Sequence, residues 1–326
     1  LNNIEVHSYH SFCVKYYDKQ CFTDKGILKL FANINKKIIN KKFKYDYIII
    51  DEAQDITPLY FKLINKIYLE NVHDVNICIL GDKFQSIYNF NEADERFIIY
   101  AQQLFNFNNF NWKELKLSKS FRITHEMADF INNCMLNEKR LFSDKISNNK
   151  PYYIKCNTFT EKNLNGLSKN YRPFEVFKKI LNVGYEPKDI FILAPSLKST
   201  KSAARCLENK IKIELPSIQI YVPTSDEEKL DESLLTNKLV FSTFHQAKGL
   251  ERKVILIYNF DDSYFKYYCK KNPNICPNEL YVAATRGIDH LILFHHYSNN
   301  YLPFLNISKL QLTTNLQGEL YLREEN

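Results

Sequence analysis

The chain has 326 residues, of which 45% are hydrophobic and 25% are charged. These proportions are typical of globular proteins and exclude a wholly disordered or fibrous chain, and at roughly 150 residues per domain the length predicts about two domains. Lys and Arg, 44 in all, outnumber the 37 Asp and Glu and give a net charge of +7. This mild excess is compatible with a nucleic-acid partner but does not establish one.

Nothing in the sequence indicates a membrane protein or a secreted protein. No run approaches the roughly 20 apolar residues that a membrane-spanning helix requires, and no N-terminal signal pattern is present. We therefore expect a soluble intracellular protein, in the nucleus or the cytoplasm. The eight cysteines have no CxxC spacing, and they predict reduced thiols with neither a zinc site nor a disulfide framework. Cys269 and Cys276 are too isolated to predict a metal site.

Short apolar runs, many of them rich in β-branched residues, alternate with helical patterns along the chain. Runs of this kind predict strands covered on both faces, as in a parallel sheet. The predicted strands are 47–50, 75–80, 190–193, 239–242, 254–258 and 291–294. The predicted helices are 57–69, which opens on Thr57 and Pro58, 124–135 and 196–208. The alternation predicts an α/β fold with ligands at the carboxyl ends of the strands.

The best candidate for a domain boundary lies at 114–117. There a polar aromatic stretch at 106–112 gives way to a further predicted strand. From residue 302 onward the pattern is too weak to assign elements. We therefore predict two domains, 1–116 and 117–326.

The segment 47–55 is an apolar strand that ends in adjacent carboxylates, within the sequence DEAQD. Acids in this position lie at the edge of the sheet where ligands bind. Asp51 could hold Mg²⁺, which prefers oxygen ligands and keeps most of its waters. Glu52 could act as a general base toward a water that attacks a phosphoryl group. Taken alone, the same residues could form an ordinary polar turn after a strand.

The next predicted strand is followed by GDKFQSIYNF at 81–90. Gln85 lies on the loop after this neighbouring strand, where a glutamine can sense a γ-phosphate or orient the attacking water. Tyr88 and Phe90 follow at alternate positions and could stack on unpaired bases. Packing in a hydrophobic core is the competing interpretation for both aromatic residues.

Together these two segments resemble motifs II and III of superfamily 1 DNA helicases of the UvrD/Rep/PcrA type. Other segments resemble further motifs in the family's order: 6–12 resembles motif Ib, 117–122 motif IV, 242–251 motif V and 280–287 motif VI. One motif alone would mean little, but their agreement in order is hard to obtain by chance. The residues DEAQD at 51–55 and SFR at 120–122 are similar to the corresponding motif sequences of the F-box DNA helicases. The resemblance implies two RecA-like α/β domains, 1A and 2A, and ATP-driven 3′-to-5′ movement along single-stranded DNA.

The resemblance also implies roles for individual residues. Arg122 and Arg286 would reach the γ-phosphate as arginine fingers, because the planar guanidinium donates bidentately to phosphate oxygens. Phe121 would lie against adenine, Glu251 would bind the ribose hydroxyls, and Gly249 of the same motif is implied to take part in binding the nucleotide. The residues implied to contact single-stranded DNA are Ser8, His10, Tyr88, Phe90, Thr243 and His245. ATP and Mg²⁺ are the implied cofactors. Without the resemblance, either arginine would be read as a surface residue and His245 as a core residue.

The largest departure from the family is the phosphate-binding loop. The pattern GxxxxGK[ST], whose glycines let backbone N–H groups wrap the phosphates, occurs nowhere in the 326 residues. In the family it precedes motif Ib, and this chain begins with Leu1 and has only Met127 and Met135 as methionines. We therefore expect a piece of a longer protein that carries the loop upstream, and domain 1A to be partial. The alternative is a degenerate helicase that binds DNA without hydrolysing ATP.

A second departure is compactness. Few residues separate motif Ib from motif II, and few precede motif V, so the accessory domains 1B and 2B are expected to be minimal or absent. This puts strong duplex separation in doubt, whereas translocation requires only the two core domains. A helicase–nuclease subunit is a further alternative, although no nuclease-like cluster of acids follows residue 287.

Overall fold

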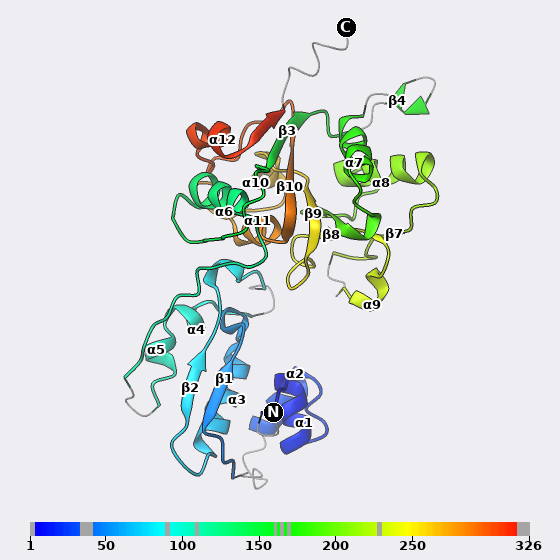
Figure 1. Cartoon of the computed structure of the whole chain (residues 1–326). Coiled ribbons are helices and arrows are strands. Elements are labelled where there is room, and N and C mark those ends of the chain that lie inside the picture. The colour runs from blue at the N-terminus through cyan, green and yellow to red at the C-terminus, as the bar shows by residue number, and fades with distance from the viewer. Residues whose placement is uncertain are drawn as a thin grey trace. The chain divides into compact units, whose positions relative to one another are not determined.

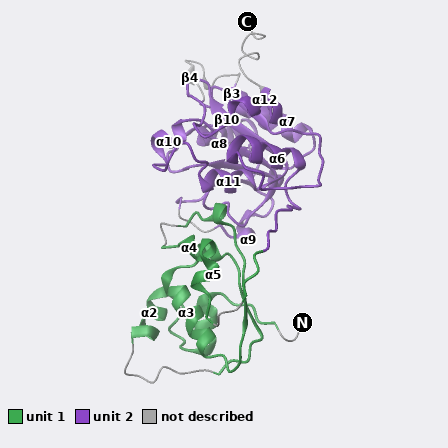
Figure 2. Cartoon of the chain, turned by 90° about the vertical axis from the view of Figure 1, so that its left-hand side faces the viewer, with its two compact units in different colours: residues 1–114 green, residues 115–326 purple. Residues whose placement is uncertain are grey.

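The computed structural model describes residues 4–32, 42–88, 92–107, 111–159, 162–163, 166–167, 171–226 and 230–317. Figure 1 labels the helices and strands. Contacts divide the chain into two compact units, Leu1–Glu114 and Leu115–Asn326, which are called unit 1 and unit 2 and are coloured separately in Figure 2.

Unit 1 is built on a two-stranded parallel sheet. β1 (Tyr47–Ile50) pairs with β2 (Asn76–Ile79), and α3 (Pro58–Leu69) forms the crossover that a parallel pair requires. Thr57 caps α3, because its Oγ1 accepts the N–H of Tyr60 at 3.2 Å, and Pro58 takes the first helical position. The two strands and the helix predicted in this part of the chain are confirmed.

Two hydrophobic clusters hold unit 1 together. Its other elements are α1 (Tyr9–Tyr16), α2 (Asp24–Ala32), α4 (Arg96–Ile99), α5 (Ala101–Leu104) and the short 3-10 helices η1 (Ala53–Asp55) and η2 (Lys83–Gln85). α1 and α2, which were not predicted, pack on α3 around Cys13, Ile27 and Leu63. α4 packs against the sheet in the second cluster, where Phe97 meets Ile50.

One face of β1 is open. Tyr47 and Ile49 are 67% and 63% exposed, whereas Ile50 is buried. The apolar run predicted a strand covered on both faces, and this prediction is wrong for β1. The reason is that the helices of the described part of unit 1 pack only on the face that carries Ile48 and Ile50.

Unit 2 is built on a seven-stranded sheet in which every strand pair is parallel, in the order β11-β3-β10-β9-β6-β8-β7. The strands are β3 (Tyr152–Cys156), β6 (Ile190–Ala194), β7 (Ile220–Tyr221), β8 (Leu239–Thr243), β9 (Arg252–Ile257), β10 (Gly287–His296) and β11 (Asn315–Gln317). β6 and β8 are buried along their whole length, as expected where both faces of a parallel sheet are covered. The predicted α/β class with a parallel sheet is confirmed.

Helices cover both faces of this sheet (Figure 1). α7 (Arg172–Asn182) and α8 (Ala203–Glu214) lie on one face, where Phe177 and Leu207 pack against the strands. α6 (His125–Phe130), α11 (Asn278–Ala284) and α12 (Ile307–Thr313) lie on the other. The smaller elements of the unit are α9 (Glu232–Leu235), α10 (Ser263–Tyr267), the π-helical segment η4 (Ile131–Leu136) and the hairpin of β4 (Lys162–Asn163) and β5 (Gly166–Leu167).

The helix predicted at 124–135 forms as α6 and η4, and it begins where predicted. Thr124 Oγ1 accepts the N–H of Met127 at 3.2 Å. The helix predicted at 196–208 was placed too early, because α8 begins at Ala203. The carboxylate of Asp226 accepts the Ser196 hydroxyl at 2.6 Å and the Leu197 N–H at 3.0 Å, and these bonds hold that segment outside the helix.

The further strand predicted after residue 112 is not formed. This part of the chain makes only an isolated bridge between Lys119 and Phe142. The reason is that 118–120 runs beside a loop and not beside the sheet. Toward the C-terminus, where no element was assigned from the sequence, α12 and β11 complete the sheet edge.

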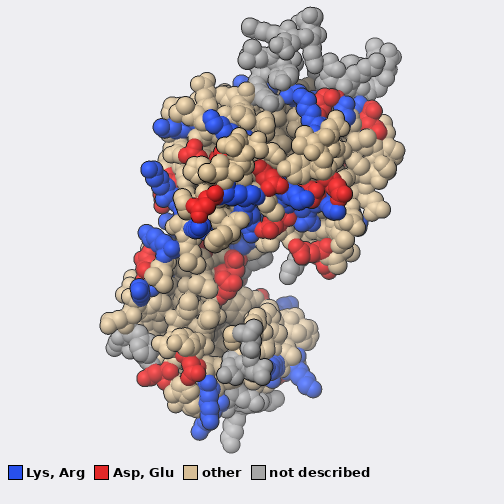
Figure 3. All heavy atoms as spheres, in the orientation of Figure 1, with Lys and Arg blue, Asp and Glu red and all other residues tan. Residues whose placement is uncertain are grey.

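Basic and acidic side chains are mixed on the face of unit 2 that Figure 3 shows. Ion pairs in unit 2 include Lys253 with Asp189 at 3.1 Å and Lys178 with Glu175 at 2.9 Å. On this face, basic side chains therefore lie among acidic ones. Among the described helices, none combines the length and the apolar character that would let it cross a membrane.

Candidate functional site

The adjacent carboxylates of DEAQD, Asp51 and Glu52, lie at the carboxyl end of β1, as predicted. The Ala53 N–H donates to Leu80 O at 2.9 Å, which joins the turn after β1 to the end of β2. Asp51 and Glu52 are exposed at this edge. Glu52 has φ 52°, a left-handed conformation that few residues other than glycine adopt, and this turn directs the chain from the strand into η1.

A buried glutamine, Gln54, organises this edge of unit 1. Its Nε2 donates to Glu52 Oε2, and its Oε1 accepts the Asp82 N–H at 2.9 Å. A Cβ on Gly81 would lie 2.5 Å from Oε1, so a larger residue at this position would have to displace the Gln54 amide that accepts the Asp82 N–H. Gln54 therefore connects the general-base candidate Glu52 to the loop that follows β2.

Gln85 lies on that same loop. Asp82 caps η2 by accepting the Phe84 N–H at 2.9 Å, and the Gln85 amide donates to the other oxygen of Asp82 at 3.2 Å. Through Gln54 and Asp82, the structure therefore places Gln85 at the same sheet edge as Glu52.

Tyr88 is half-buried near this edge. Burial raises the pKa of Tyr88, and the carboxylates of Asp55 and Glu52 raise it further, so the phenol lies within electrostatic range of both acids. Phe90, the second predicted stacking residue, lies outside the described residues.

Ser8 and His10 lie at the start of α1. Ser8 caps the helix, because its Oγ accepts the Ser11 N–H at 3.2 Å. His10 Nε2 is 2.9 Å from Asp24 Oδ1, the same oxygen that accepts the Tyr60 hydroxyl at 2.8 Å. Both side chains thus make local contacts, and Ser8 remains exposed.

In unit 2, Ser120, Phe121, Arg122 and Glu251 line a hollow of about 400 Å³. Arg122 Nε donates to Glu251 Oε2, and Arg122 Nη1 donates to Thr285 O at 3.4 Å. Phe121 is 86% exposed beside this pair. An exposed aromatic ring next to a charged pair is suited to stacking on a base. The structure therefore brings together three residues that the resemblance assigned to the nucleotide.

Arg286 is buried beside the hollow. Its Nε donates to Val282 O at 2.9 Å and its Nη2 to Thr285 Oγ1 at 3.0 Å. Its carbonyl accepts the N–H of Arg252, the first residue of β9, at 3.2 Å. Both arginines therefore donate to Thr285, Arg122 to its carbonyl oxygen and Arg286 to its hydroxyl oxygen.

This group lies at the amino ends of the strands. Glu251 precedes β9, and Arg286 precedes β10, whose Gly287 is paired with Arg252. This position differs from the carboxyl ends of the strands, where the sequence predicts ligands. The reason is that motifs V and VI end only after the chain has returned across the sheet to begin the next strand. Gly249 lies on one return path with φ +84°, and nothing lies within 4 Å of an added Cβ, so backbone conformation and not packing requires glycine.

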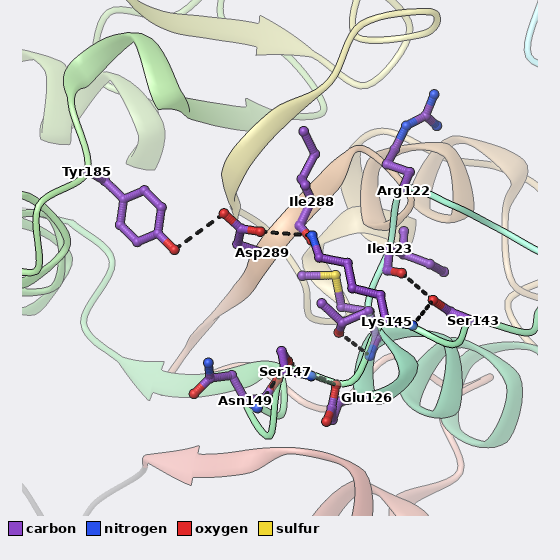
Figure 4. A network of polar contacts seen from close by, with 12 residues as sticks. Arg122, Ile123, Glu126, Ser143, Lys145, Ser147, Asn149, Tyr185, Ile288 and Asp289 are labelled. Atoms are coloured by element: carbon purple, nitrogen blue, oxygen red, sulfur yellow. Dashed lines mark hydrogen bonds and ion pairs between the residues drawn. The ribbon is translucent and has the colours of Figure 1, made fainter.

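A strap of chain, residues 142–147, holds the segment that carries Arg122 (Figure 4). The Ser120 N–H donates to Phe142 O at 2.7 Å. The Ser143 hydroxyl donates to Ile123 O, also at 2.7 Å. The backbone on both sides of Arg122 is therefore fixed by the strap.

The strap is in turn fixed to β10 by one lysine. The Lys145 ammonium donates to Ile288 O at 2.7 Å and to Asp289 Oδ1 at 2.9 Å, and the Tyr185 hydroxyl lies 3.5 Å from the other carboxylate oxygen (Figure 4). These contacts come two and three residues after Arg286. The strap thereby links the two arginine-bearing segments.

Thr243 and His245 lie at the opposite edge, where Thr243 is the last residue of β8 and His245 follows it. Thr243 is buried, and its hydroxyl donates to Gln246 Oε1 at 2.9 Å. His245 is partly exposed, with Nε2 3.9 Å from Glu279 Oε1. Burial lowers the pKa of His245 below its usual 6.5, Lys271 lowers it further, and Glu279 opposes the shift. The shift favours the neutral form of the His245 imidazole.

The residues present fit the implied cofactors. Mg²⁺ is usually held by one or two carboxylates together with phosphate oxygens and waters, and Asp51 offers one exposed carboxylate at a strand end. Among the described residues no group of three or more His, Cys, Asp or Glu side chains is placed to hold a metal. A Mg²⁺ ion at Asp51 would therefore take most of its ligands from phosphate oxygens and waters. The hollow suits a purine nucleotide chemically, because the hollow presents an exposed aromatic ring, a guanidinium and a carboxylate.

Two functional features were missed from the sequence. Gln54 is part of DEAQD, but nothing in the sequence predicted that its side chain would form hydrogen bonds at the ends of both strands. Lys145 lies outside every motif and had no signal, because its importance depends on a contact with β10 that is distant in sequence.

Comparisons with known proteins support the resemblance. Residues 25–106 match the family described as the UvrD/REP helicase N-terminal domain. A probable DNA helicase II homolog from Mycoplasma capricolum is 30% identical over 173 residues, covering 51% of this chain and 22% of that protein. The F-box DNA helicase protein 1 of Schizosaccharomyces pombe is 37% identical over 89 residues, covering 27% of this chain and 9% of that protein. The predicted resemblance to UvrD-type DNA helicases is thus confirmed.

Helicase/nuclease proteins are among the relatives as well. One component of an ATP-dependent helicase/nuclease from Clostridium beijerinckii is 30% identical over 94 residues, covering 29% of this chain and 8% of that protein. The matched part of the chain spans less than a quarter of the length of each of these relatives. Among solved structures, the C-terminal domain of a possible DNA helicase from Lactobacillus plantarum WCFS1 aligns with a TM-score of 0.38 at 15% identity, covering 60% of this chain and 98% of that chain.

Proposed function

We propose that this chain supplies the two core domains of an ATP-driven DNA helicase that moves 3′ to 5′ along single-stranded DNA. Residues 1–116 are the partial domain 1A and residues 117–326 are domain 2A. The observation that carries the proposal is the hollow in unit 2, where Phe121, Arg122 and Glu251 meet beside Arg286. A protein that only binds DNA has no use for this combination.

In the proposed reaction, the residues of unit 1 act on the phosphates. Asp51 would hold Mg²⁺, which neutralises charge on the phosphate oxygens when it is bound. Glu52 takes a proton from the attacking water, and Gln85 orients that water. The hydrogen bonds of Gln54 with Glu52 and with the Asp82 N–H fix the position of Glu52 relative to the loop that carries Gln85.

The residues of unit 2 act on the base, the ribose and the γ-phosphate. Phe121 stacks on the adenine ring, Glu251 binds the ribose hydroxyls, and Gly249 gives the backbone turn ahead of Glu251. Arg122 and Arg286 donate to the γ-phosphate. Both guanidinium groups are engaged within unit 2 in this structure, so nucleotide binding has to exchange those bonds for bonds to phosphate.

The proposed DNA contacts are Ser8, His10, Tyr88 and Phe90 from unit 1 and Thr243 and His245 from unit 2. The partial exposure of His245 suits a direct contact. Thr243 is buried, and its hydroxyl supports the turn that presents His245.

A second candidate is a helicase-like protein that binds single-stranded DNA without hydrolysing ATP. One observation favours it: no GxxxxGK[ST] pattern occurs in the 326 residues. Without such a loop, the backbone N–H groups and the lysine that cradle the β- and γ-phosphates are lacking.

The N-terminal sequence and intact mass of the native protein separate the two candidates. Upstream residues that contain a glycine-rich GK[ST] loop, together with ATP hydrolysis that single-stranded DNA stimulates and Arg286→Ala abolishes, are the expected result. A native start at Leu1, with no hydrolysis, would overturn the helicase proposal in favour of the DNA-binding candidate.

A further inference from the structure

A segment between β9 and α11 presents two exposed aromatic rings that no motif includes. Tyr267, at the end of α10, is 76% exposed, and Tyr268 is 44% exposed. Their ring centroids lie 6.4 Å apart with the rings at 76° to each other. Figure 2 shows α10 at the periphery of unit 2. Two neighbouring exposed rings offer faces on which a planar ligand could stack.

The segment is firmly anchored beneath these rings. The buried Tyr264 packs against Phe244, with ring centroids 5.9 Å apart. The N–H groups of Tyr268 and Cys269 both donate to Tyr264 O, at 2.9 and 3.0 Å. The exposure of the two tyrosines therefore does not come from a loose loop, because the structure holds them outward.

This anchor connects the segment to the turn that carries His245. Phe244, the packing partner of Tyr264, is the residue immediately before His245. Lys271, at the far end of the segment, donates to Glu279 Oε1 at 2.7 Å, and His245 lies 3.9 Å from the same oxygen. The segment and the proposed DNA contact His245 therefore share one surface at the carboxyl edge of the sheet.

The charge exposed along the segment is positive. Lys266 is 51% exposed, whereas Asp262, its partner at 2.9 Å, is 13% exposed. Lys271 is 52% exposed, whereas its partner Glu279 is 9% exposed. Lys270 is exposed as well. Because the ammonium groups lie outside and their acids inside, a ligand would meet basic groups on both sides of the two rings.

We propose that Tyr267 and Tyr268 form a stacking platform for bases of single-stranded DNA, and that Lys266, Lys270 and Lys271 contact the phosphates next to those bases. This platform would extend the DNA contact at His245, and the inference rests on the proposed function. Stacking requires only ring faces, which every base offers, and flanking lysines supply the electrostatic attraction that follows the backbone.

The test is the affinity of the chain for a fluorescently labelled oligothymidine, measured by anisotropy. We expect the Tyr267→Ala/Tyr268→Ala double variant to bind about 5- to 100-fold more weakly, the range that stacking on aromatic side chains supports. Tyr267→Phe/Tyr268→Phe should keep the parental affinity, because it retains both ring faces. Tyr100→Ala, which removes a half-exposed tyrosine ring of unit 1 that has no proposed role, should bind like the parent.

His245→Ala separates a failure of the platform from a failure of the proposed function. If His245→Ala weakens binding while the tyrosine double variant binds like the parent, the platform is wrong and the proposed DNA contact stands. If the parental chain does not bind the oligothymidine, both are overturned. Parental DNA affinity combined with altered self-association of the double variant in sedimentation would assign the tyrosines to a protein interface instead.

Discussion

Glu52 is positioned by its neighbours more than by its own strand. Its left-handed backbone turns it out of β1, and Gln54 binds its carboxylate from within the core. A general base requires this kind of fixed orientation, because proton transfer depends on hydrogen-bond geometry before it depends on pKa. The sequence was sufficient to predict Asp51 and Glu52 at a strand end, but the orienting role of Gln54 depends on a contact with the chain after β2.

For Glu52→Gln in the native protein, we expect DNA-stimulated ATP turnover to fall at least about a hundredfold, which is the usual size of a general-base effect. The amide cannot accept the proton, but its oxygen can still accept the bond from Gln54, so nucleotide affinity should remain. Steady-state hydrolysis and a nucleotide titration measure the two effects. Glu114→Gln, an exposed site in the same unit, is the control. Normal turnover in Glu52→Gln would remove Glu52 from the mechanism.

Gly81→Ala should destabilise unit 1 by about 1–3 kcal/mol, the typical cost of forcing extra atoms into a packed site. The new Cβ would lie 2.5 Å from Gln54 Oε1. In a Gln54→Ala background the same change should cost at least about 1 kcal/mol less, since neighbouring sites are not additive. Urea unfolding of the four chains measures this coupling. Equal costs in both backgrounds would show that the two residues do not compete for the same space.

Among the elements, the strap at 142–147 has the clearest mechanical role. We expect Lys145→Met to lower the free energy of unfolding of unit 2 by about 1 kcal/mol, because it removes a hydrogen bond to Ile288 O and an ion pair with Asp289. Lys119→Met, which breaks the more exposed pair with Asp144, should cost less than about 0.5 kcal/mol. Urea midpoints compare them, and equal losses would argue against an anchoring role for Lys145.

The end of the strap predicts a pH dependence. Glu126 accepts the N–H groups of Ser147 and Asn148 at 3.2 and 2.7 Å. Burial raises the pKa of Glu126, but hydrogen bonds from the backbone and from the Ser147 hydroxyl outweigh it and lower the pKa below 4.5. The unfolded chain therefore takes up this proton at higher pH than the folded chain does. The stability from this contact is complete above 4.5 and is lost as the pH falls below it.

Urea unfolding at a series of pH values, from neutral to below 4.5, tests this dependence. Glu126→Gln should flatten the acid part of the curve, because the amide does not titrate. Glu138→Gln, on an exposed residue nearby in the chain, should leave the curve unchanged. An unchanged acid slope in Glu126→Gln would assign the acid loss to other carboxylates.

Elements could be predicted where the local pattern decides the structure. The runs that form β6 and β8 are apolar at every position, and both faces of these strands are buried. α1 could not be predicted, because Cys13 is its only buried residue and its apolar pattern is weak. The start of α8 depends on the carboxylate of Asp226, which comes from another part of the chain.

The same distinction applies to the candidate site. Motif order predicted that Phe121, Arg122, Glu251 and Arg286 belong to one nucleotide site, and the structure brings these four residues close together. Their grouping at the amino ends of β9 and β10 was not predicted, because strand direction and the return paths across the sheet decide it. The ion pair between Arg122 and Glu251 is likewise a tertiary contact that neither motif contains by itself.

For the whole molecule, binding to single-stranded DNA should weaken as salt rises. Each phosphate contacted releases counterions, so the logarithm of the affinity should fall with a slope of about −0.7 per contact against the logarithm of the salt concentration. Lys270→Met should reduce this slope by about one contact. Anisotropy titrations over a range of salt measure both slopes. An affinity independent of salt would exclude a track of phosphate contacts.

The connection between β8 and β9 has a further consequence. Eight residues, 244–251, carry the chain from the carboxyl edge of the sheet to its amino edge, whereas a parallel crossover usually takes a dozen or more. The Ala247 N–H donates to Thr243 O at 3.1 Å and the Leu250 N–H donates to Ala247 O at 3.1 Å, so its own backbone hydrogen bonds hold this short connection in place. A pull on His245 therefore reaches Glu251 as tension along the backbone. In a motor that grips DNA at one edge and nucleotide at the other, this short link would carry force directly between the two.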